Sequence, residues 1–297
     1  MFPRHQIQLQ EIGPVFRQHG YIPDDTVCMA VYLSLSLNKP LLIEGPAGVG
    51  KTEITKVMAA ILDTELIRLQ CYEGLDYTHA IYEWNYQRQL LQLKIIENAN
   101  TSAQEKEKTI FSESFLMKRP LLEAITREKS PVLLIDEVDR ADDEFESFFL
   151  EILSDWQITI PEIGTIKAVQ KPFVILTGNR SRDLSDALRR RCFYLYIDYP
   201  DLEKELEIVR HKVPGIDATL SRQICRFLQE VRKLKLDKTP GISETIDWAY
   251  ALAALHIDFL EPAIIQQTLG IIIKDRKDSQ EIQLSLNRLL EETGIIR

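Results

Sequence analysis

A single eight-residue segment constrains the fold of this chain more than any other feature of the sequence. It reads Gly45-Pro46-Ala47-Gly48-Val49-Gly50-Lys51-Thr52 and matches the pattern G-x-x-x-x-G-K-[ST] in full. An apolar run at residues 41–43 precedes it, and a helix-like stretch at residues 51–62 follows. Glycines let the backbone curl so that successive N–H groups face one anion, and the following helix offers its N-terminus to that anion. The segment therefore predicts a phosphate-binding loop, and its context disfavours the alternative of a glycine turn without nucleotide.

Two residues at the end of this loop are expected to carry much of its chemistry. Lys51 is expected to neutralise the β- and γ-phosphates of a nucleotide, and the Thr52 hydroxyl is expected to bind Mg²⁺. The other predicted nucleotide contacts come from the loop and the first turn of the helix: Gly45, Pro46, Ala47, Gly48, Val49, Gly50 and Glu53.

An acidic pair is the second signal. Asp136 and Glu137 follow the run at residues 132–135, which is entirely apolar, as a strand buried on both faces of a sheet should be. Asp136 is expected to hold Mg²⁺ through its hydration shell, and Glu137 to polarise the attacking water as general base. Phosphoryl transfer depends mainly on positioning and charge stabilisation, so a carboxylate that orients this water is sufficient. The alternative is an acidic pair that caps a helix.

A polar residue and a cluster of arginines complete the set. Asn179 follows the apolar run at residues 173–176, so its amide could contact the γ-phosphate or the attacking water, although Gly-Asn is also common in ordinary turns. Three arginines at residues 189–191 precede another strand-like run. An arginine supplied across a subunit boundary can stabilise transition-state charge. Arg190 and Arg191 are the candidates; a solvated basic turn or pairing within the chain are the alternatives.

Apolar runs alternate with helix-like stretches in the first two-thirds of the chain. This alternation predicts a parallel α/β sheet, with strands expected at residues 41–43, 66–69, 132–135, 173–176 and 194–197. After residue 200 the pattern becomes helical, with an N-cap at Asp201 and helices expected at residues 201–213, 219–234, 243–259 and 262–274. The sequence therefore predicts an α/β domain over residues 1–199 and a helical domain over residues 200–297.

Two segments depart from this pattern. Residues 98–108 are polar and lack an apolar period, so they are expected to form an exposed, mobile loop. Residues 157–166 alternate apolar and polar side chains around Pro161 and Gly164, which predicts a β-hairpin.

The composition limits the environment and the partners of the protein. Its formal net charge of −9 argues against non-specific binding to nucleic acid, which needs clustered Lys and Arg. The four cysteines form no C-x-x-C pair and are expected to be buried free thiols in a reducing cytoplasm. Residues 1–12 are polar and mixed, without a basic region followed by an apolar core, so no signal peptide is expected. No apolar run approaches about 18 residues, so no membrane segment is expected. The five histidines are scattered, and no transition-metal site is predicted.

These four motifs, in this order and followed by a helical region, resemble the AAA+ ATPases. Within that group, the segments at residues 136–141 and 150–160 are similar to the MoxR family. Three further segments, at residues 69–76, 82–86 and 197–200, are similar to its CoxD-like branch. The similarity extends from about Tyr21 to Lys274. The phosphate-binding loop is shared by many families, whereas the other segments are more specific.

The resemblance implies a fold, an activity and roles for the residues above. The sheet would have the order 5-1-4-3-2, with an extra element around residues 79–96 inserted in the second helix and a C-terminal helical lid. Mg-ATP would be hydrolysed between the subunits of a ring, usually a hexamer. Asp136 and Glu137 would be the Walker B residues, Asn179 sensor 1, and Arg190 or Arg191 the arginine finger.

The resemblance also implies a partner. MoxR proteins are similar to chaperones that remodel or mature client proteins, often metalloenzymes, and often act beside a protein with a von Willebrand A domain. CoxD-like members are associated with maturation of a molybdenum- and copper-containing dehydrogenase. The sequence departs from the family at the sensor 2 position, because Gly241-Ile242-Ser243-Glu244-Thr245 contains no arginine and Arg232 lies well upstream.

Other functions stay open at the level of the sequence. A nucleic-acid motor or loader would need basic or stacking aromatic residues on its pore loops. The aromatic residues Tyr82, Trp84 and Tyr86 precede Arg88 and Lys94, but the acidic balance of the chain favours packing or client contact. A nucleotide-dependent scaffold would bind ATP without turnover. A small-molecule kinase also carries a phosphate-binding loop, and the acidic pair, the polar strand end and the arginines argue against it.

Overall fold

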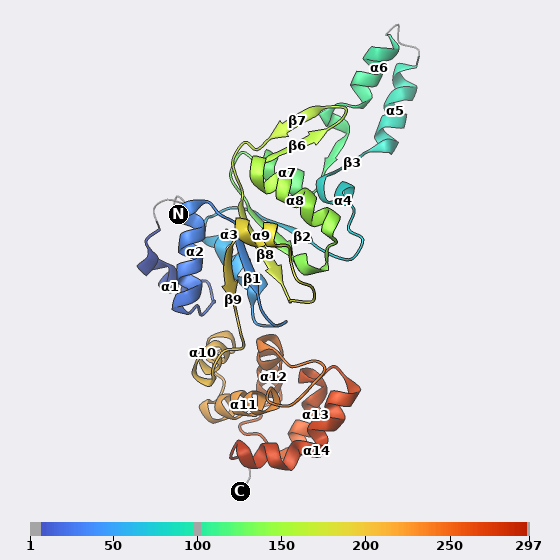
Figure 1. The fold of residues 1–297 in the computed structure, drawn as a ribbon. Helices are drawn as coiled ribbons and strands as arrows, with labels where there is room; N and C mark the ends of the chain where they lie inside the picture. The colour runs from blue at the N-terminus through green and yellow to red at the C-terminus, as the bar shows by residue number, and fades with distance from the viewer. Residues whose placement is uncertain (1–6, 98–101, 296–297) are drawn as a thin grey trace. The chain divides into compact units, whose positions relative to one another are not determined.

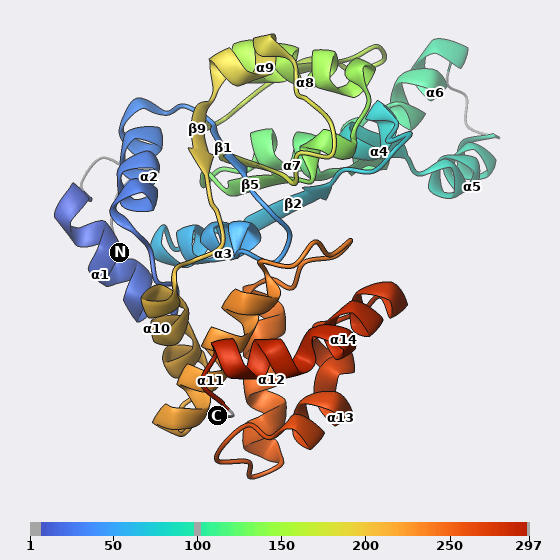
Figure 2. The same ribbon diagram turned by 60° about the horizontal axis from the view of Figure 1, so that its bottom comes forward.

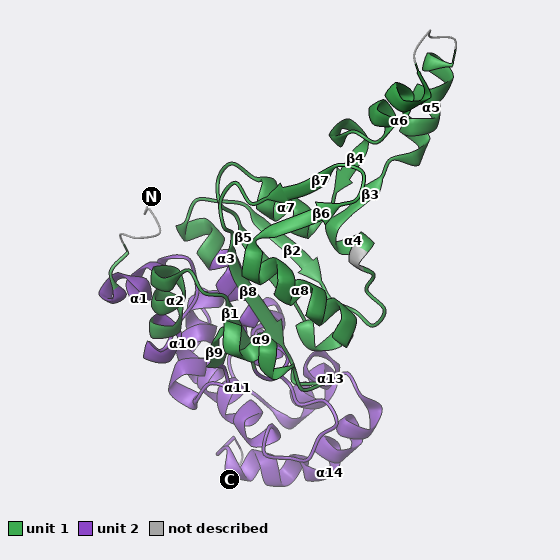
Figure 3. Ribbon diagram, turned by 45° about the horizontal axis from the view of Figure 1, so that its top comes forward, with its two compact units in different colours: residues 1–8, 29–44, 58–195 green, residues 9–28, 45–57, 196–297 purple. Residues whose placement is uncertain are grey.

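The computed structural model describes residues 7–97 and 102–295, which form two compact units (Figure 3). The first unit contains the described residues up to Gln8 together with Met29–Glu44 and Met58–Leu195. The second contains Leu9–Cys28, Gly45–Val57 and the described residues from Tyr196 onward. The domain division at residues 199 and 200 stays a prediction.

A five-stranded parallel sheet forms the centre of the first unit (Figure 1). Its strands stand in the order β2-β5-β8-β1-β9. In register, Leu133 of β5 lies opposite Val174 of β8. Counted along the chain, this order is 5-1-4-3-2, which confirms the predicted fold class. The strands are β1 (Leu41–Glu44), β2 (Leu66–Gln70), β5 (Val132–Asp136), β8 (Phe173–Gly178) and β9 (Phe193–Tyr196).

Strand β5, which lies between β2 and β8, shows why its apolar run is uninterrupted. All five of its residues are buried. Leu133 and Ile135 join a core cluster with α7 (Pro120–Thr126), α8 (Asp143–Asp155) and α9 (Asp186–Arg191). Since side chains alternate between the faces of a sheet, the residues between them face the opposite side. Burial on both faces leaves no position on the strand for a polar residue until its carboxyl end.

An insertion separates β2 from α7 and includes the residues around 79–96. It contains α4 (Tyr77–Ile81), β3 (Tyr82–Trp84), α5 (Tyr86–Ile96), α6 (Ala103–Ile110), the 3₁₀ turn η1 (Glu113–Phe115) and β4 (Leu116–Lys118). The strands β3 and β4 form an antiparallel ribbon, and α5 and α6 extend from its end (Figure 1).

The polar segment at residues 98–108 was expected to be a loop, and this prediction is wrong from Ser102 onward. Ser102 caps α6 in a capping box with Glu105, and the segment behind it is rich in strong helix formers. None of the residues of α6 is buried. A helix that buries no face needs no apolar residues at helical spacing, so its sequence shows no apolar period. Residues 98–101 lie outside the described residues.

The expected hairpin is confirmed. β6 (Gln157–Ile160) pairs antiparallel with β7 (Gly164–Lys167). Gly164 has a φ of +102°, a conformation that suits glycine at the end of the connecting turn.

The C-terminal part of the second unit is helical (Figure 2). Asp201 caps α10 as predicted, because its carboxylate accepts a hydrogen bond of 2.8 Å from the Lys204 N–H. Phe227 and Trp248 lie fully buried in the core, with ring centroids 5.6 Å apart. The helices are α10 (Leu202–Lys212), α11 (Ala218–Val231), α12 (Ile242–Ala254), α13 (Pro262–Ile272) and α14 (Arg276–Glu292).

The first helices of the chain are divided between the two units. α1 (Leu9–Gln18) belongs to the second unit, and α2 (Asp25–Leu37) and α3 (Lys51–Ile61) each begin in it and end in the first. All four cysteines are free thiols, as predicted; Cys192 is half-buried and the others are buried. None of the described helices combines the length and the apolar character that crossing a bilayer requires.

Candidate functional site

The predicted phosphate-binding loop joins the end of β1 to the start of α3 and belongs to the second unit. Its glycines at residues 45, 48 and 50 have φ values of +155°, +75° and +92°. Residues with a side chain rarely adopt these conformations. A side chain at Gly45 would in addition collide with the carbonyl of Ile197. The loop therefore curls as the sequence predicts, through positions that only glycine fills without strain.

The ammonium group of Lys51 lies inside this curl. Its side chain is buried and donates hydrogen bonds to the carbonyls of Gly45, at 2.8 Å, and Pro46, at 2.6 Å. Thr52 follows it in the first turn of α3. Glu53 was predicted to contact the nucleotide, and its carboxylate makes ion pairs within the unit, to Lys56 at 3.1 Å and to Lys212 at 3.6 Å.

The acidic pair lies in the first unit, at the carboxyl end of β5. Asp136 is buried, and both oxygens of its carboxylate accept hydrogen bonds. The Thr177 hydroxyl of β8 donates to Oδ1. The Arg68 guanidinium of β2 donates to Oδ2 at 2.6 Å. The two neighbouring strands thus fix the orientation of this carboxylate.

The next residue, Glu137, turns the chain sharply away from the strand. It has left-handed backbone angles, φ 53° and ψ 48°, a conformation that costs free energy for a non-glycine residue and is often found at functional sites. Its carboxylate accepts hydrogen bonds from Gln70 Nε2 at 3.1 Å and from Asn179 Nδ2 at 3.3 Å. Arg140 Nε lies 3.3 Å from the same carboxylate. The structure thus brings together three of the predicted residues, Asp136, Glu137 and Asn179.

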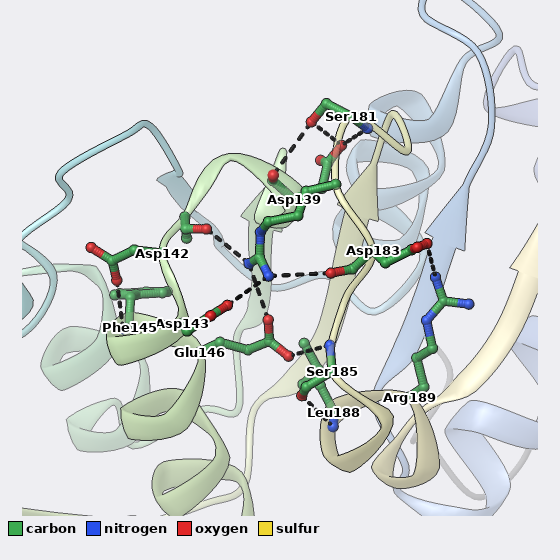
Figure 4. Close-up of polar contacts among 12 residues, drawn as sticks. Asp139, Asp142, Asp143, Phe145, Glu146, Ser181, Asp183, Ser185, Leu188 and Arg189 are labelled. Carbon is green, nitrogen blue, oxygen red and sulfur yellow. Dashed lines mark hydrogen bonds and ion pairs between the residues drawn. The ribbon is translucent and has the colours of Figure 1, made fainter.

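A third acidic residue, Asp139, holds the loop that carries Asn179, and its contacts with Ser181 are drawn in Figure 4. Its Oδ2 accepts hydrogen bonds from the Asn179 N–H at 3.1 Å, from the Ser181 N–H at 2.7 Å and from the Ser181 hydroxyl at 2.6 Å. Burial by itself raises the pKa of Asp139, but these hydrogen bonds outweigh it and lower the pKa below its ordinary value. The ionised carboxylate therefore fixes the backbone on both sides of residue 180.

A buried carboxylate on α8 extends this network toward the arginine cluster (Figure 4). Glu146 accepts hydrogen bonds from Arg182 Nη2 at 3.1 Å and from the Ser185 N–H at 2.7 Å. Arg182 also donates to the Ala141 carbonyl at 2.8 Å and to Asp143 at 2.9 Å. Ser185 is the N-cap of α9. The helix that carries the arginines is thus tied to the segment that follows the acidic pair.

The three arginines of α9 have different surroundings. Arg189 Nη2 lies 3.4 Å from Glu44 Oε1, whose side chain is fully buried and also accepts a hydrogen bond from the Tyr194 hydroxyl at 3.0 Å. Arg191 donates to the Ser154 hydroxyl and to the Ala187 carbonyl, both at 3.2 Å.

Arg190 is exposed and makes no hydrogen bond or ion pair to any residue that the structure describes. Arg191, the other residue nominated as arginine finger, is also exposed, but its Nε and Nη1 are already engaged within the unit.

Several residues of this site were not predicted. Gln70, Thr177 and Glu44 lie at or next to the carboxyl ends of sheet strands, whereas Arg68 lies in the middle of β2. In parallel sheets, ligands bind at that edge. The sequence signal that could have identified Gln70, Thr177 and Glu44 is a polar residue at the end of each strand-like run.

The comparisons with known proteins agree with this fold. Residues 40–192, just over half of the chain, match the family model described as AAA domain (dynein-related subfamily). An uncharacterized protein of Staphylococcus aureus is 26% identical over 281 residues, 92% of this chain and 98% of that protein. A second uncharacterized protein, from Staphylococcus haemolyticus, is 25% identical over 275 residues, which are 90% of this chain and 95% of that protein.

Solved structures show the same fold. One RuvB mutant of Thermotoga maritima has a TM-score of 0.50 at 19% identity, with 92% of this chain and 83% of that chain covered. A second has a TM-score of 0.50 at 17% identity, with 99% and 86% covered. At this identity the likeness concerns the fold alone, that of an AAA+ P-loop NTPase with a helical C-terminal region. Since the family model covers more than half of the chain, the protein belongs to the AAA domain family, dynein-related subfamily.

Proposed function

We propose that this protein hydrolyses Mg-ATP, with Glu137 as the general base that activates the attacking water. The observation that carries the proposal is the side-chain amide of Asn179, 3.3 Å from the Glu137 carboxylate, at the edge where β5 and β8 end. A carboxylate beside an amide can hold a water molecule from two sides, as base and as hydrogen-bond donor. Positioning of this kind supplies most of the catalysis of phosphoryl transfer.

The residues available for the nucleotide suit a triphosphate. The loop at residues 45–52 presents a glycine-rich backbone without side chains at its tightest points, and Lys51 holds a positive charge inside it. Pro46, Ala47 and Val49 would add backbone contacts. Thr52 and Asp136 offer hydroxyl and carboxylate oxygens, the ligands that Mg²⁺ prefers. When bound, Mg²⁺ would neutralise charge on the β- and γ-phosphoryl oxygens.

In the proposed reaction the chain acts at three points. Glu137 orients the water and takes a proton from it as the water oxygen bonds to the γ-phosphorus. The bond from that phosphorus to the β–γ bridging oxygen breaks, and ADP and phosphate leave. Lys51 and an arginine from a neighbouring subunit, Arg190 by preference over Arg191, stabilise the charge of the transition state.

The wider role extends this chemistry to a partner protein. The segments similar to MoxR proteins, and to their CoxD-like branch, support an ATP-driven chaperone that assembles as a ring, with the hexamer as the expected form. Its client would be a protein matured or remodelled in the cytoplasm, with a metalloenzyme as the favoured class and a von Willebrand A domain protein as a partner. In this scheme residues 1–199 bind the nucleotide, and residues 200–297 form the lid that moves with turnover.

The decisive experiment compares phosphate release by the wild type with that by Glu137→Gln, which keeps the shape of the side chain and removes its basicity. Wild type should release phosphate, and the variant should bind ATP but lose turnover by roughly 10²-fold or more. Glu144→Gln is the matched control, because this glutamate is exposed and makes no described polar contact. Equal rates with no phosphate release above background in either protein would instead support a scaffold that binds ATP without turnover, and equal measurable rates would rule out Glu137 as the general base.

The client can be sought with the same variant. Glu137→Gln with ATP should trap the assembled ring, so affinity capture should enrich a partner protein. Capture with Lys51→Ala, which should not bind ATP, sets the background. Enrichment of the same proteins by both variants would remove the support for ATP-dependent engagement of a client.

A further inference from the structure

A turn at the start of α12 contacts the predicted phosphate-binding loop directly. Gly48 of that loop accepts hydrogen bonds through its carbonyl from the N–H groups of Ile242, at 2.9 Å, and Ser243, at 3.3 Å. Ile242 and Ser243 are the first two residues of the helix, where backbone N–H groups have no partner within the helix. The helix thus places its spare donors on the loop. The same segment lacks the arginine that the family resemblance leads one to expect.

The backbones approach so closely that neither could carry a side chain at the contact. A Cβ atom at Gly241 would lie 2.8 Å from the Ala47 carbonyl oxygen and from the Gly48 Cα. A Cβ atom at Gly48 would lie 2.8 Å from the Ser243 hydroxyl oxygen. Real Cβ atoms do not approach other atoms this closely, so the two glycines permit the contact.

A buried ion pair between Glu205 and Arg232 holds the turn at residues 241–243 in position. Arg232, at the end of α11, donates to Glu205 of α10 through Nη1 and Nη2, both at 2.7 Å. The two side chains are 6% and 0% exposed. Arg232 also donates to the Pro240 carbonyl at 2.9 Å and to the Thr245 hydroxyl at 2.9 Å. A bidentate, buried pair with further hydrogen bonds has little freedom to move, so the turn is held from both of its ends.

The contact determines which way one amide of the loop points. The peptide bond between Gly48 and Val49 is trans. In a planar trans peptide the carbonyl and the next N–H point in opposite directions. Because the Gly48 carbonyl is directed at α12, the Val49 N–H is directed away from α12. In loops of this type such N–H groups are the phosphate ligands.

We propose that the turn at residues 241–243, held by the Glu205–Arg232 pair, positions the Val49 N–H for nucleotide binding. It is a positioning element that acts through the loop backbone and does not itself touch the nucleotide. This inference rests on the proposed function, since it concerns the affinity of the loop for ATP.

The test removes one donor and leaves the helix start intact. Ile242→Pro deletes the N–H that bonds Gly48, while proline is well suited to the first position of a helix. Gly241 before it has extended backbone angles, φ −89° and ψ −169°, which proline tolerates in its neighbour. Ile242→Ala is the matched control, because it loses at least as much apolar packing and keeps the N–H.

The measurements are the dissociation constant for ATP, the turnover at saturating ATP and the melting temperature without nucleotide. Relative to Ile242→Ala, Ile242→Pro should bind ATP about fivefold more weakly, as expected for one hydrogen bond. Turnover at saturation and the melting temperature should be similar in the two variants. Gly241→Ala, which places a methyl group against Ala47 and Gly48, should weaken binding as well, whereas Gly270→Ala, where a methyl group meets open space, should not.

Equal ATP affinity in Ile242→Pro and Ile242→Ala, both folded, would overturn the inference and leave the proposed function standing. Absence of ATP binding by wild type would overturn the proposed function itself. If Ile242→Pro does not fold, the comparison of Gly241→Ala with Gly270→Ala decides, and equal affinities there would overturn the inference.

Discussion

Asn179 Nδ2 lies 3.3 Å from Glu137 Oε1, although 42 positions separate the two residues in the chain. The distance follows from the sheet, since β5 and β8 are parallel neighbours and both end at this edge. Asp139 strengthens the relationship, because it binds the backbone N–H of Asn179 at 3.1 Å from the same turn that carries Glu137. The backbone after β5 and the backbone after β8 therefore together determine the distance between Glu137 and Asn179.

This geometry gives the first prediction. Asn179→Ala should lower turnover by roughly 10²-fold, because the water loses one of the groups that orient it. The affinity for ATP should change little if the amide acts mainly on the water. Steady-state phosphate release and equilibrium binding of ATP separate the two effects. Asn287→Ala, an exposed asparagine on α14 without a described polar contact, is the control. A loss of affinity with unchanged turnover would instead place the amide on the γ-phosphate.

The second prediction concerns the arginines of α9. Arg190→Ala should reduce turnover by about 10³-fold or more if its guanidinium serves a neighbouring subunit, and its melting temperature should match that of wild type. Arg191→Ala should have a smaller effect, since this side chain is already bonded to Ser154 and Ala187. Mixing Arg190→Ala with Lys51→Ala should restore part of the activity. A mixture that stays inactive would contradict action across the subunit boundary.

Arg189 supplies a third prediction of a different kind. Its partner Glu44 is fully buried and depends on Arg189 and Tyr194 for polar contacts, with Arg180 Nε at 3.9 Å. Arg189→Ala should therefore destabilise the fold by roughly 1–3 kcal/mol. Chemical unfolding in urea measures this loss. An unchanged unfolding free energy would show that the remaining partners satisfy the carboxylate.

The sequence predicted most of this fold because the signals were local. The runs at 132–135 and 173–176 are apolar on every residue, as strands buried on both faces must be, and the glycines of the loop mark positions of positive φ. The helix expected at residues 243–259 ends at Ala254, because the chain turns there and His256 adopts a φ of +55°. The clearest error, at Ser102–Lys108, also has a physical reason. α6 forms from its cap and its helix propensity without burying any residue, so an apolar period could not reveal it.

The unpredicted part of the site depends on neighbours in space. Arg68 and Gln70 lie in the same strand and bind Asp136 and Glu137 respectively, and this follows only from the pairing of β2 with β5. Arg232 shows the same limit. Its distance along the chain from residues 241–245 argued against a role there, yet the fold brings its side chain within 2.9 Å of Thr245. Strand order and helix packing decide such contacts, and no local pattern encodes them.

The fourth prediction uses the lowered pKa of Asp139. A carboxylate whose pKa is lower in the folded state binds fewer protons there than in the unfolded chain. Its contribution to stability is therefore present above the ordinary pKa of 3.8 and is lost as the pH falls through the folded value. Asp139→Asn should be less stable than wild type near neutral pH, and the gap should narrow from about pH 5 to about pH 3. Urea unfolding at several pH values measures it; a gap independent of pH would contradict the assignment.

The last prediction tests the ion pair behind the α12 turn. Replacing either Glu205 by Gln or Arg232 by Met should cost about 3–5 kcal/mol, because each change leaves a buried group without its partner. The double variant should lose clearly less than the sum of the two single losses, since no unpaired charge remains. A double-mutant cycle from urea unfolding gives this interaction free energy.

Lys233→Met paired with Glu230→Gln is a suitable control, because that neighbouring pair is 2.7 Å apart and Lys233 is 68% exposed. Its coupling should be at most about 1 kcal/mol. Additive losses in the Glu205–Arg232 cycle would mean that the pair does not act as one unit, and the turn would then owe its position to the backbone hydrogen bonds of Gly48 alone.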